Sequence, residues 1–421
     1  MKKIIMFVFA CLAEGCSAVN ATDARIAGLL VEPWMVASDD SQELFYPSGI
    51  ALYGNEAVLS AMSKTGHISY GLSGIILNGS VENYTGEAAK PAMPPSTAEE
   101  NYYYNYPYSR VINLPMKNYS VSCGLPINEL VSAAVRIGLA PASDSIKSEQ
   151  NDGNGNFYYN TDRSTKDFNL SAGVSIKNIF DLGIMAGVPT LENKSIYNIF
   201  LSDGTMSPRL YENTGYDYAF YTKVNARFMM PWLIVAFNYE LVSSRLVDIK
   251  QIDTTSNGVF TDISDINLSY SDTFNGYDIG GGIASNLALN DSLSLIIGLS
   301  VKYNYTEEQA INNDLNNPPY RTYADKCLNQ WNASANAAFE YRINGQFTWR
   351  AGLSQGLVSL YSGNLYDYTG YPGKTYPLTN RTTIGTIVST GLTAEFGNLL
   401  IDGVISTNNG FLSQVAVKYR L

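Results

Sequence analysis

Residue types that perform acid–base or nucleophilic chemistry form no recognisable catalytic arrangement in this chain of 421 residues. Histidine occurs once, as His67. A hydrolase with a Ser-His-Asp triad would need that histidine beside a nucleophile, and nothing in the sequence places one there. We therefore interpret His67 as a solvated turn residue and expect no catalytic residues and no enzymatic activity.

A possible metal-binding stretch is SEQNDGNGNF, in which Asp152, Asn154 and Asn156 alternate as the ligands of a calcium loop do. Phe157 stands where that motif needs glycine, and Arg163 stands where it needs a bidentate glutamate. An ordinary loop is the better interpretation, with weak calcium binding left open because the chain is acidic. We expect no metal site and no cofactor.

Charged residues at alternating positions of polar faces are a third candidate group: Arg136, Lys223, Arg227, Glu240, Glu340, Arg342 and Arg350. If the flanking segments pair as hairpins, Lys223 lies diagonal to Glu240 and Arg350 lies diagonal to Glu340. Such pairs either fill an interior with salt bridges or act as a selectivity filter, and we favour the first. The elements that position them decide what kind of interior this is.

These elements are β-strands, because a period of two residues dominates the sequence. In SLSLIIGLSVKYNY the odd positions from Leu293 to Tyr305 are apolar, and the even positions are mostly small or polar. Similar runs recur at 68–76, 131–139 and 384–396, with a weaker one at 110–125. The sequence therefore predicts long strands with one apolar and one polar face.

The connections between these strands alternate in length. Short ones lie near residues 125, 177, 229, 289, 343 and 396, and long ones cover roughly 79–109, 147–165, 192–214, 248–273, 307–327 and 361–381. Tight turns on one side and long loops on the other are typical of outer-membrane barrels. Strands leaving the tight-turn side begin at 68, 130, 179, 232, 292, 346 and 398, and seven return. We therefore predict an all-β, 14-stranded antiparallel transmembrane β-barrel.

A secreted β-sandwich is the alternative, but its inner faces would be apolar, whereas the polar faces here carry residues such as Asn332 and Glu340. Aromatic residues near the strand ends fit interfacial girdles, namely Phe228, Trp232, Trp331, Phe347, Trp349, Phe396 and Tyr419. The expected location is the bacterial outer membrane. The expected surroundings are membrane lipid and outer-leaflet lipopolysaccharide.

Composition and the N-terminus agree with export. Charged residues make up 15% of the chain, against about 25% in soluble proteins. Residues 1–21 read as a signal peptide with two lysines and a short apolar core, and a lipid anchor on Cys16 is the less favoured alternative. The formal net charge of −11 excludes nucleic-acid binding through phosphate neutralisation.

The segment before the first predicted strand contains ATDARIAGLL, the acidic pair Asp39-Asp40 and the run Tyr46-Pro47-Ser48-Gly49-Ile50. It resembles the N-terminal region of the FadL/TodX family of outer-membrane transporters, in which an N-P-A-G-hydrophobic motif precedes the barrel. Asn is replaced by Tyr and Ala by Ser here. The resemblance implies a plug at 22–66 inside a barrel at 67–421, with Asp39, Asp40, Pro47, Ser48 and Gly49 at the gate. Alternatively, YPSG only turns the chain into the first strand.

The first long loop contains Tyr102, Tyr103, Tyr104, Tyr106 and Tyr108. Tyrosines offer large amphipathic surfaces, so we expect ligand capture, an interfacial girdle or loop packing from this group. The resemblance implies passive uptake of a hydrophobic small-molecule ligand, fatty-acid-like or aromatic. A general diffusion porin for polar solutes and a surface or secretion-accessory barrel with a protein partner stay open, and the sequence predicts no oligomeric state.

Overall fold

The structure is a computed structural model that describes residues 23–36, 46–52, 55–60, 65–84, 116–151, 155–201, 209–253, 267–313, 321–367, 374–382, 385–407 and 410–421. Several predicted features lie outside these residues: the signal peptide, Asp39, Asp40, the tyrosines of the first long loop, and Asp152 and Asn154 of the calcium-like stretch. Within the described ranges, no helix has the length and apolar character needed to cross a membrane.

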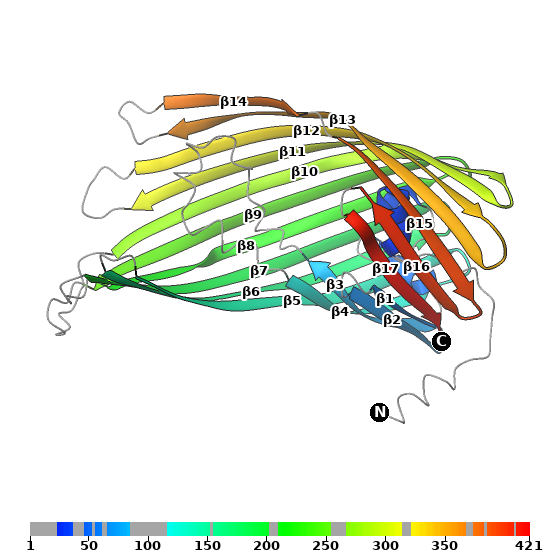
Figure 1. Cartoon of the computed structure of the whole chain (residues 1–421), viewed down its shortest axis with the longest axis horizontal. Coiled ribbons are helices and arrows are strands. Elements are labelled where there is room, and N and C mark those ends of the chain that lie inside the picture. Colours follow the sequence, from blue (N-terminus) through cyan, green and yellow to red (C-terminus); the bar gives the residue numbers. More distant parts are fainter. Residues whose placement is uncertain are drawn as a thin grey trace.

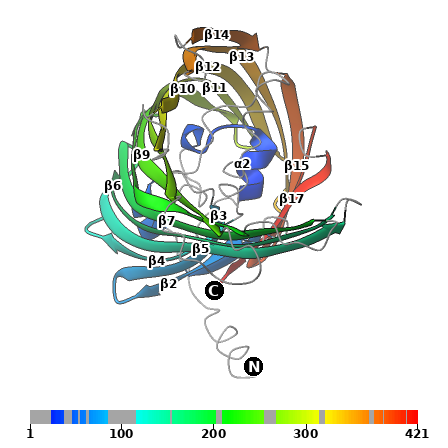
Figure 2. The same ribbon diagram turned by 90° about the vertical axis from the view of Figure 1, so that its left-hand side faces the viewer.

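The described strands form one antiparallel sheet that closes into a ring (Figures 1 and 2). They are β1 (Glu56–Ser60), β2 (Thr65–Leu72), β3 (Ile75–Tyr84), β4 (Met116–Pro126), β5 (Val131–Asn151), β6 (Gly155–Ile176), β7 (Phe180–Leu201), β8 (Arg209–Met229), β9 (Ile234–Asp253), β10 (Asn267–Asn290), β11 (Leu293–Asn313), β12 (Arg321–Arg342), β13 (Phe347–Asp367), β14 (Lys374–Thr382), β15 (Thr386–Phe396), β16 (Leu399–Ser406) and β17 (Gly410–Arg420). Both β14 and β15 pair with β13, so they are two parts of one barrel strand. The barrel therefore has 16 strands, and it closes where β1 pairs with β17.

The prediction of 14 strands is wrong, because the run 68–76 is a hairpin and not one strand. Ser73 and Gly74 have φ of 50° and 84°. Positive φ at both residues is typical of the two-residue hairpin turn whose twist matches that of antiparallel strands. The lipid-facing positions change there from even numbers, as at Leu72, to odd numbers, as at Ile75. The other missed strand is β1, whose five residues are too few to show a clear period. It lies inside the predicted plug range 22–66, so the barrel wall begins before residue 67.

Two aromatic girdles mark the membrane-facing band on the outside of the ring. The ring pairs nearer the tight turns are Phe180–Phe228, Phe339–Trp349 and Phe347–Phe396, and those nearer the long loops are Tyr277–Tyr305 and Tyr303–Trp331. On β12 the exposed rings of Trp331 and Tyr341 are 341 − 331 = 10 residues apart. At about 3.3 Å per residue and a tilt near 40°, that is roughly 25 Å, the height of a lipid-facing band.

On the long-loop side of the Tyr277–Trp331 girdle, the outer surface becomes polar. Lys166 is exposed there, two residues nearer the long loop than the exposed Phe168, and Lys194 and Glu192 form an exposed ion pair of 2.5 Å. Strands β5–β13, of 20 to 24 residues, continue past this level as a tall wall, whereas β1–β4 and β15–β17 have 5 to 11 residues (Figure 1). An apolar band between aromatic girdles on a closed antiparallel ring places the chain in a bacterial outer membrane.

Candidate functional site

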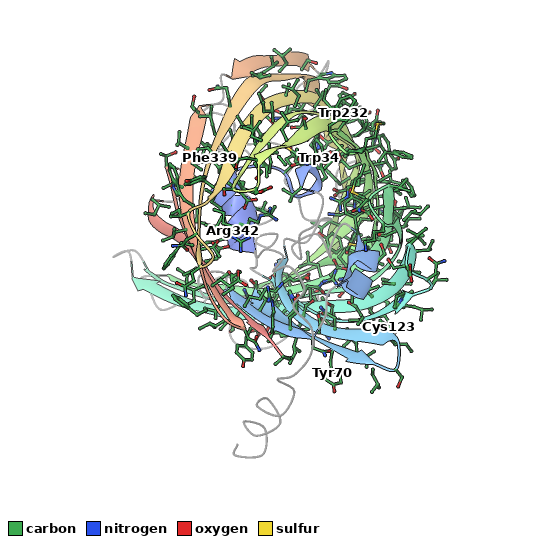
Figure 3. The ribbon with its side chains drawn as sticks, turned by 90° about the vertical axis from the view of Figure 1, so that its right-hand side faces the viewer. Trp34, Tyr70, Cys123, Trp232, Phe339 and Arg342 are labelled. Atoms are coloured by element: carbon green, nitrogen blue, oxygen red, sulfur yellow. The ribbon has the colours of Figure 1, made fainter. Side chains whose placement is uncertain are left out.

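The described N-terminal residues lie inside the ring and contact three sectors of its wall (Figures 2 and 3). We call residues 23–36 and 46–52 the lumen segment. Its α2 (Asp23–Leu29) contacts β13, β15 and β16, its η1 (Pro33–Met35) contacts β9 and β10, and its η3 (Pro47–Leu52) contacts β4, β5 and β6. Trp34 of η1 lies inside the ring, whereas Tyr70 of β2 lies outside it (Figure 3).

The wall lacks side chains where the lumen segment contacts it, at Gly124, Gly173, Gly282, Gly298 and Gly352. A Cβ at Gly352 would collide with the carbonyl oxygen of Leu29, at the end of α2. At Gly298, a Cβ would come within 2.6 Å of the Met35 sulfur. Glycine in a strand interior weakens it, and it often marks a close approach of another backbone. These glycines thus form a fitted seat for the lumen segment.

An ion-pair network joins α2 to the wall; we call Arg25, Glu340, Arg350, Asp402 and Thr393 the α2 network. Arg25 donates to both carboxylate oxygens of Glu340, at 2.8 and 2.5 Å. Arg350 Nε lies 3.5 Å from that carboxylate, and its Nη1 donates to Asp402 at 2.7 Å and 2.8 Å. Arg350 also donates to Thr393. Glu340 and Arg350 are direct cross-strand partners, so the register differs by two residues from the predicted one, which made them diagonal.

A second network, centred on Arg227, lies on β6, β7 and β8. Arg227 Nε donates to Asp181 at 2.6 Å, its Nη1 donates to the Val36 carbonyl at 2.7 Å, and its guanidinium stacks 4.5 Å from the centre of the Tyr46 ring. Burial raises the pKa of the Tyr46 hydroxyl, which Arg227 opposes, so the ring is neutral beneath the cation. Arg227 thus joins one wall strand to two parts of the lumen segment.

The predicted gate residues Pro47, Ser48 and Gly49 lie in η3, and Ser48 provides the polar contact. Its hydroxyl is 2.6 Å from that of Ser175 on β6, which in turn donates to Asp181. Its carbonyl accepts from the Ser132 hydroxyl at 3.3 Å. Ser48 is fully buried, so η3 is connected by hydrogen bonds to the Arg227 network.

Apolar packing completes the seat. Leu29, Val31, Met35 and Val36 form one buried cluster with the inward-facing Ile234, Ala284, Ile296 and Ala338. Wall amides also donate to the segment's backbone: Asn336 Nδ2 reaches the Leu30 carbonyl at 2.6 Å and Asn286 Nδ2 reaches the Met35 carbonyl at 2.9 Å. The lumen segment is therefore held in its seat by apolar packing, hydrogen bonds and ionic contacts together.

Further toward the long loops, the lumen wall of β7–β10 carries a second apolar surface. We call it the upper apolar patch, and it consists of Met185, Leu191, Tyr216, Ala219, Tyr221, Val242, Leu246 and Phe274. On β9 the patch begins at Val242, 242 − 234 = 8 residues beyond Ile234, which contacts the lumen segment. At about 3.3 Å per residue, the patch begins roughly 26 Å further along that strand.

The β7–β8 ladder is interrupted beside this patch, between Gly187 and Glu192. Pro189 falls in the gap, and a proline in a sheet occurs at edges or irregularities because it donates no backbone hydrogen bond. The Tyr221 ring lies over Gly187, where a Cβ would collide with it. Glycine at 187 thus lets the fully buried Tyr221 lie flat against the wall.

The structure disperses the predicted lumen charges over several pairs. Lys223 lies directly opposite Glu240 at 3.5 Å, instead of diagonal to it. Arg136 is fully buried and donates to Glu82 and to Ser120, the latter at 2.9 Å. Arg342 is exposed at the tight-turn end of β12. Arg227 and Glu340 bond to the lumen segment directly, and Arg350 is connected to it through Glu340.

The interpretation of His67 as a solvated turn residue is wrong. It lies in β2, with Nε2 at 3.3 Å from Glu56 of β1 and only 13% of its side chain exposed. Lys418 of β17 also reaches Glu56, at 2.8 Å. The histidine therefore belongs to the polar contacts where the first and last strands close the ring.

Important partners that the sequence did not suggest are Arg25, Asp181 and Asp402. Asp181 lies directly opposite Arg227 in the β7–β8 register, so the parity test applied to Lys223 would have found it. Arg25 carries no such signal, because its partner Glu340 is 315 residues away.

No protein-family model matches the sequence, and no curated protein matches it. Solved structures do match over most of the chain. A FadL homologue from Pseudomonas aeruginosa matches with a TM-score of 0.42 and 12% identity, covering 96% of this chain and 99% of that one. The CymD monoaromatic hydrocarbon channel gives 0.40 and 10%, covering 94% and 96%. The toluene transporter TodX from Pseudomonas putida gives 0.35 and 10%, covering 90% and 91%. The closed ring of strands with its apolar outer band makes the chain an outer-membrane β-barrel, and FadL homologues and monoaromatic hydrocarbon channels are among the barrels to which it is similar.

Proposed function

We propose that the chain is a passive outer-membrane transporter for small hydrophobic molecules, gated by the lumen segment. The observation that carries the proposal is the upper apolar patch on the lumen face beyond the seated segment. A ligand arriving from the long-loop side meets this patch before it meets α2, η1 and η3. Movement of the lumen segment then opens the way to the tight-turn side.

An apolar patch inside a lumen suits an apolar cargo better than a polar one. Burying apolar surface is favourable by about 25 cal/mol per Å², so an apolar ligand gains from leaving water for this wall. Ligand sites are typically apolar surfaces with few polar groups. A water-filled diffusion pore has no use for buried side chains such as Met185, Tyr221 and Val242 on its inner face.

The contacts of the lumen segment suit reversible seating. The lumen segment combines the ion pair between Arg25 and Glu340 with the hydrogen bond from Arg227 to the Val36 carbonyl and with apolar packing. Each contact is non-covalent, so the seated and released arrangements exchange by population shift. A ligand that favours the released arrangement shifts the balance by its difference in affinity for the two.

Binding of p-xylene to the purified protein in nanodiscs tests the proposal. The amount of p-xylene in the headspace is measured above nanodiscs that contain the protein, and empty nanodiscs serve as the blank. Wild type should retain p-xylene above the blank. Replacing Val242, which faces the lumen, by Asp should weaken binding at least about tenfold, because a buried charge excludes an apolar ligand. The control Ser243→Asp adds the same charge on the outer face of β9 and should bind as wild type.

The alternatives give different results. Retention equal to the blank in wild type contradicts transport of hydrophobic molecules. Rapid swelling of proteoliposomes in sucrose would instead support a general diffusion porin, and a stoichiometric protein partner in detergent would support an accessory barrel.

A further inference from the structure

Three fully buried polar atoms on the lumen face of β4 and β6 have no hydrogen-bond partner within the structure described above. They are Asn118 Nδ2, Asn169 Oδ1 and Ser171 Oγ. The three residues are 1 to 2% exposed, so bulk water does not supply the partner. Buried polar groups are nearly always paired, so an unpaired group calls for a physical explanation.

The two amides converge on one point of the wall. Asn169 Nδ2 donates to Asn118 Oδ1 at 3.2 Å, which leaves one donor and one acceptor unused. Gly138 of β5 lies between them, and a Cβ there would be 3.0 Å from Asn118 Nδ2 and would collide with Asn169 Oδ1. The unused donor and acceptor are therefore close enough for one small polar group to reach both.

Asn169 and Ser171 border the upper apolar patch directly. Ser171 is the cross-strand partner of Met185, and Asn169 is the partner of Gly187, over which Tyr221 lies. The lumen wall thus changes from hydrogen-bonding to apolar between β6 and β7. A molecule with one polar end and an apolar body matches both sides of that boundary.

The charges nearby favour a neutral polar end over an anionic one. Two cations lie nearby: Arg136 is bonded to Glu82 and Ser120, and Lys223, opposite Met185, lies 3.5 Å from Glu240. Asp167 is fully buried two positions from Asn169 on the same strand and face, and would repel a carboxylate. Because Asn169 Oδ1 accepts and Asn118 Nδ2 donates, the best partner both donates and accepts, as a hydroxyl or an amide does.

We propose that Asn118, Asn169 and Ser171 form a subsite for the hydroxyl or amide head of a neutral amphiphile whose apolar body lies on the upper apolar patch. This inference rests on the proposed function and narrows its cargo. The subsite should bind p-cresol and p-xylene with different affinities, although these two molecules have the same size and differ only by a hydroxyl in place of a methyl group. The wild-type protein should bind p-cresol more tightly than p-xylene, after the amount of each ligand dissolved in the nanodisc lipid is subtracted.

Equilibrium dialysis of both ligands against protein in nanodiscs tests the inference. Asn169→Leu, which keeps the branched shape of the side chain and removes the amide, should raise the dissociation constant of p-cresol about tenfold, the size of one or two neutral hydrogen bonds. The dissociation constant of p-xylene should stay unchanged. Asn332→Leu removes a lumen amide from β12 and should leave the preference for p-cresol as in wild type.

Ser171→Ala is the smaller second variant, in case Asn169→Leu loses its folded, heat-modifiable form. It should weaken p-cresol binding by about threefold and leave p-xylene unchanged. Binding of both ligands with no change of preference in a folded variant overturns the subsite and shows that the amides hold ordered water only. Binding of neither ligand to wild type overturns the proposed function itself, which is a different result.

Discussion

Gly352→Val should unseat α2 and raise the permeability of the barrel to small solutes. A Cβ at this position collides with the backbone carbonyl of Leu29, and backbone cannot move aside as a flexible side chain can. Overpacking of this kind costs about 1–3 kcal/mol, which changes the ratio of seated to released segment by roughly 5- to 150-fold. Proteoliposome swelling in sucrose measures the effect.

Gly403→Val is the matched control for this experiment. Gly403 lies on β16, which β15 separates from β13, and an added Cβ there meets no atom within 4 Å. The variant should fold and swell as wild type does. Equal permeability of Gly352→Val and Gly403→Val, with both folded, would show that the contact at Leu29 does not hold the lumen closed.

Arg350→Met should destabilise the barrel by about 3–5 kcal/mol, because it removes the cation whose Nη1 donates to both oxygens of the buried Asp402 carboxylate. The two side chains are 4% and 1% exposed, so solvent does not compensate. Glu340 keeps Arg25 as a partner, so the loss concentrates at Asp402. The midpoint of unfolding in guanidinium chloride, followed by the loss of heat-modifiable migration, measures it.

Two further variants distinguish the loss of the Arg350–Asp402 interaction from the loss of a charge in general. Arg350→Met with Asp402→Leu removes both charges and should recover most of the lost stability. Lys194→Ala removes a cation from an ion pair whose side chains are 63% and 57% exposed, and should change stability by less than about 1 kcal/mol. An Arg350→Met variant as stable as wild type would contradict the structural role of the α2 network.

Much of the barrel could be predicted from the sequence, because each strand is long enough to show its period. The tight turns from Val131 onward agree with the predicted positions to within a few residues. The strand ends on the long-loop side do not, because the strands continue into the predicted connections; β6, for example, begins at Gly155, inside the connection predicted at 147–165. The count failed at the N-terminal end, where β1 is short and the Ser73-Gly74 turn is hidden in one apolar run. A change in the parity of apolar positions was the available signal for that turn.

The candidate site was less predictable, because it depends on contacts between distant parts of the chain. Parity correctly placed Glu340 and Arg350 on the lumen face as neighbours, but it missed their register by two residues. A bulge between Tyr216 and Tyr218 reverses the face of Tyr216, which joins the upper apolar patch instead of the lipid surface. Propensity and period contain no signal for a seat made of glycines.

Cysteine trapping between the lumen segment and the wall tests the central claim most directly. The hydroxyl oxygens of Ser48 and Ser175 are 2.6 Å apart, so the double variant Ser48→Cys with Ser175→Cys brings two thiols within bonding reach. Cys123 and Cys327 are free thiols and should be replaced by Ser first. In outer membranes under mild oxidation, we expect a disulfide between positions 48 and 175 that dithiothreitol reverses. Absence of that disulfide from a folded barrel would contradict the placement of the N-terminal segment inside the ring.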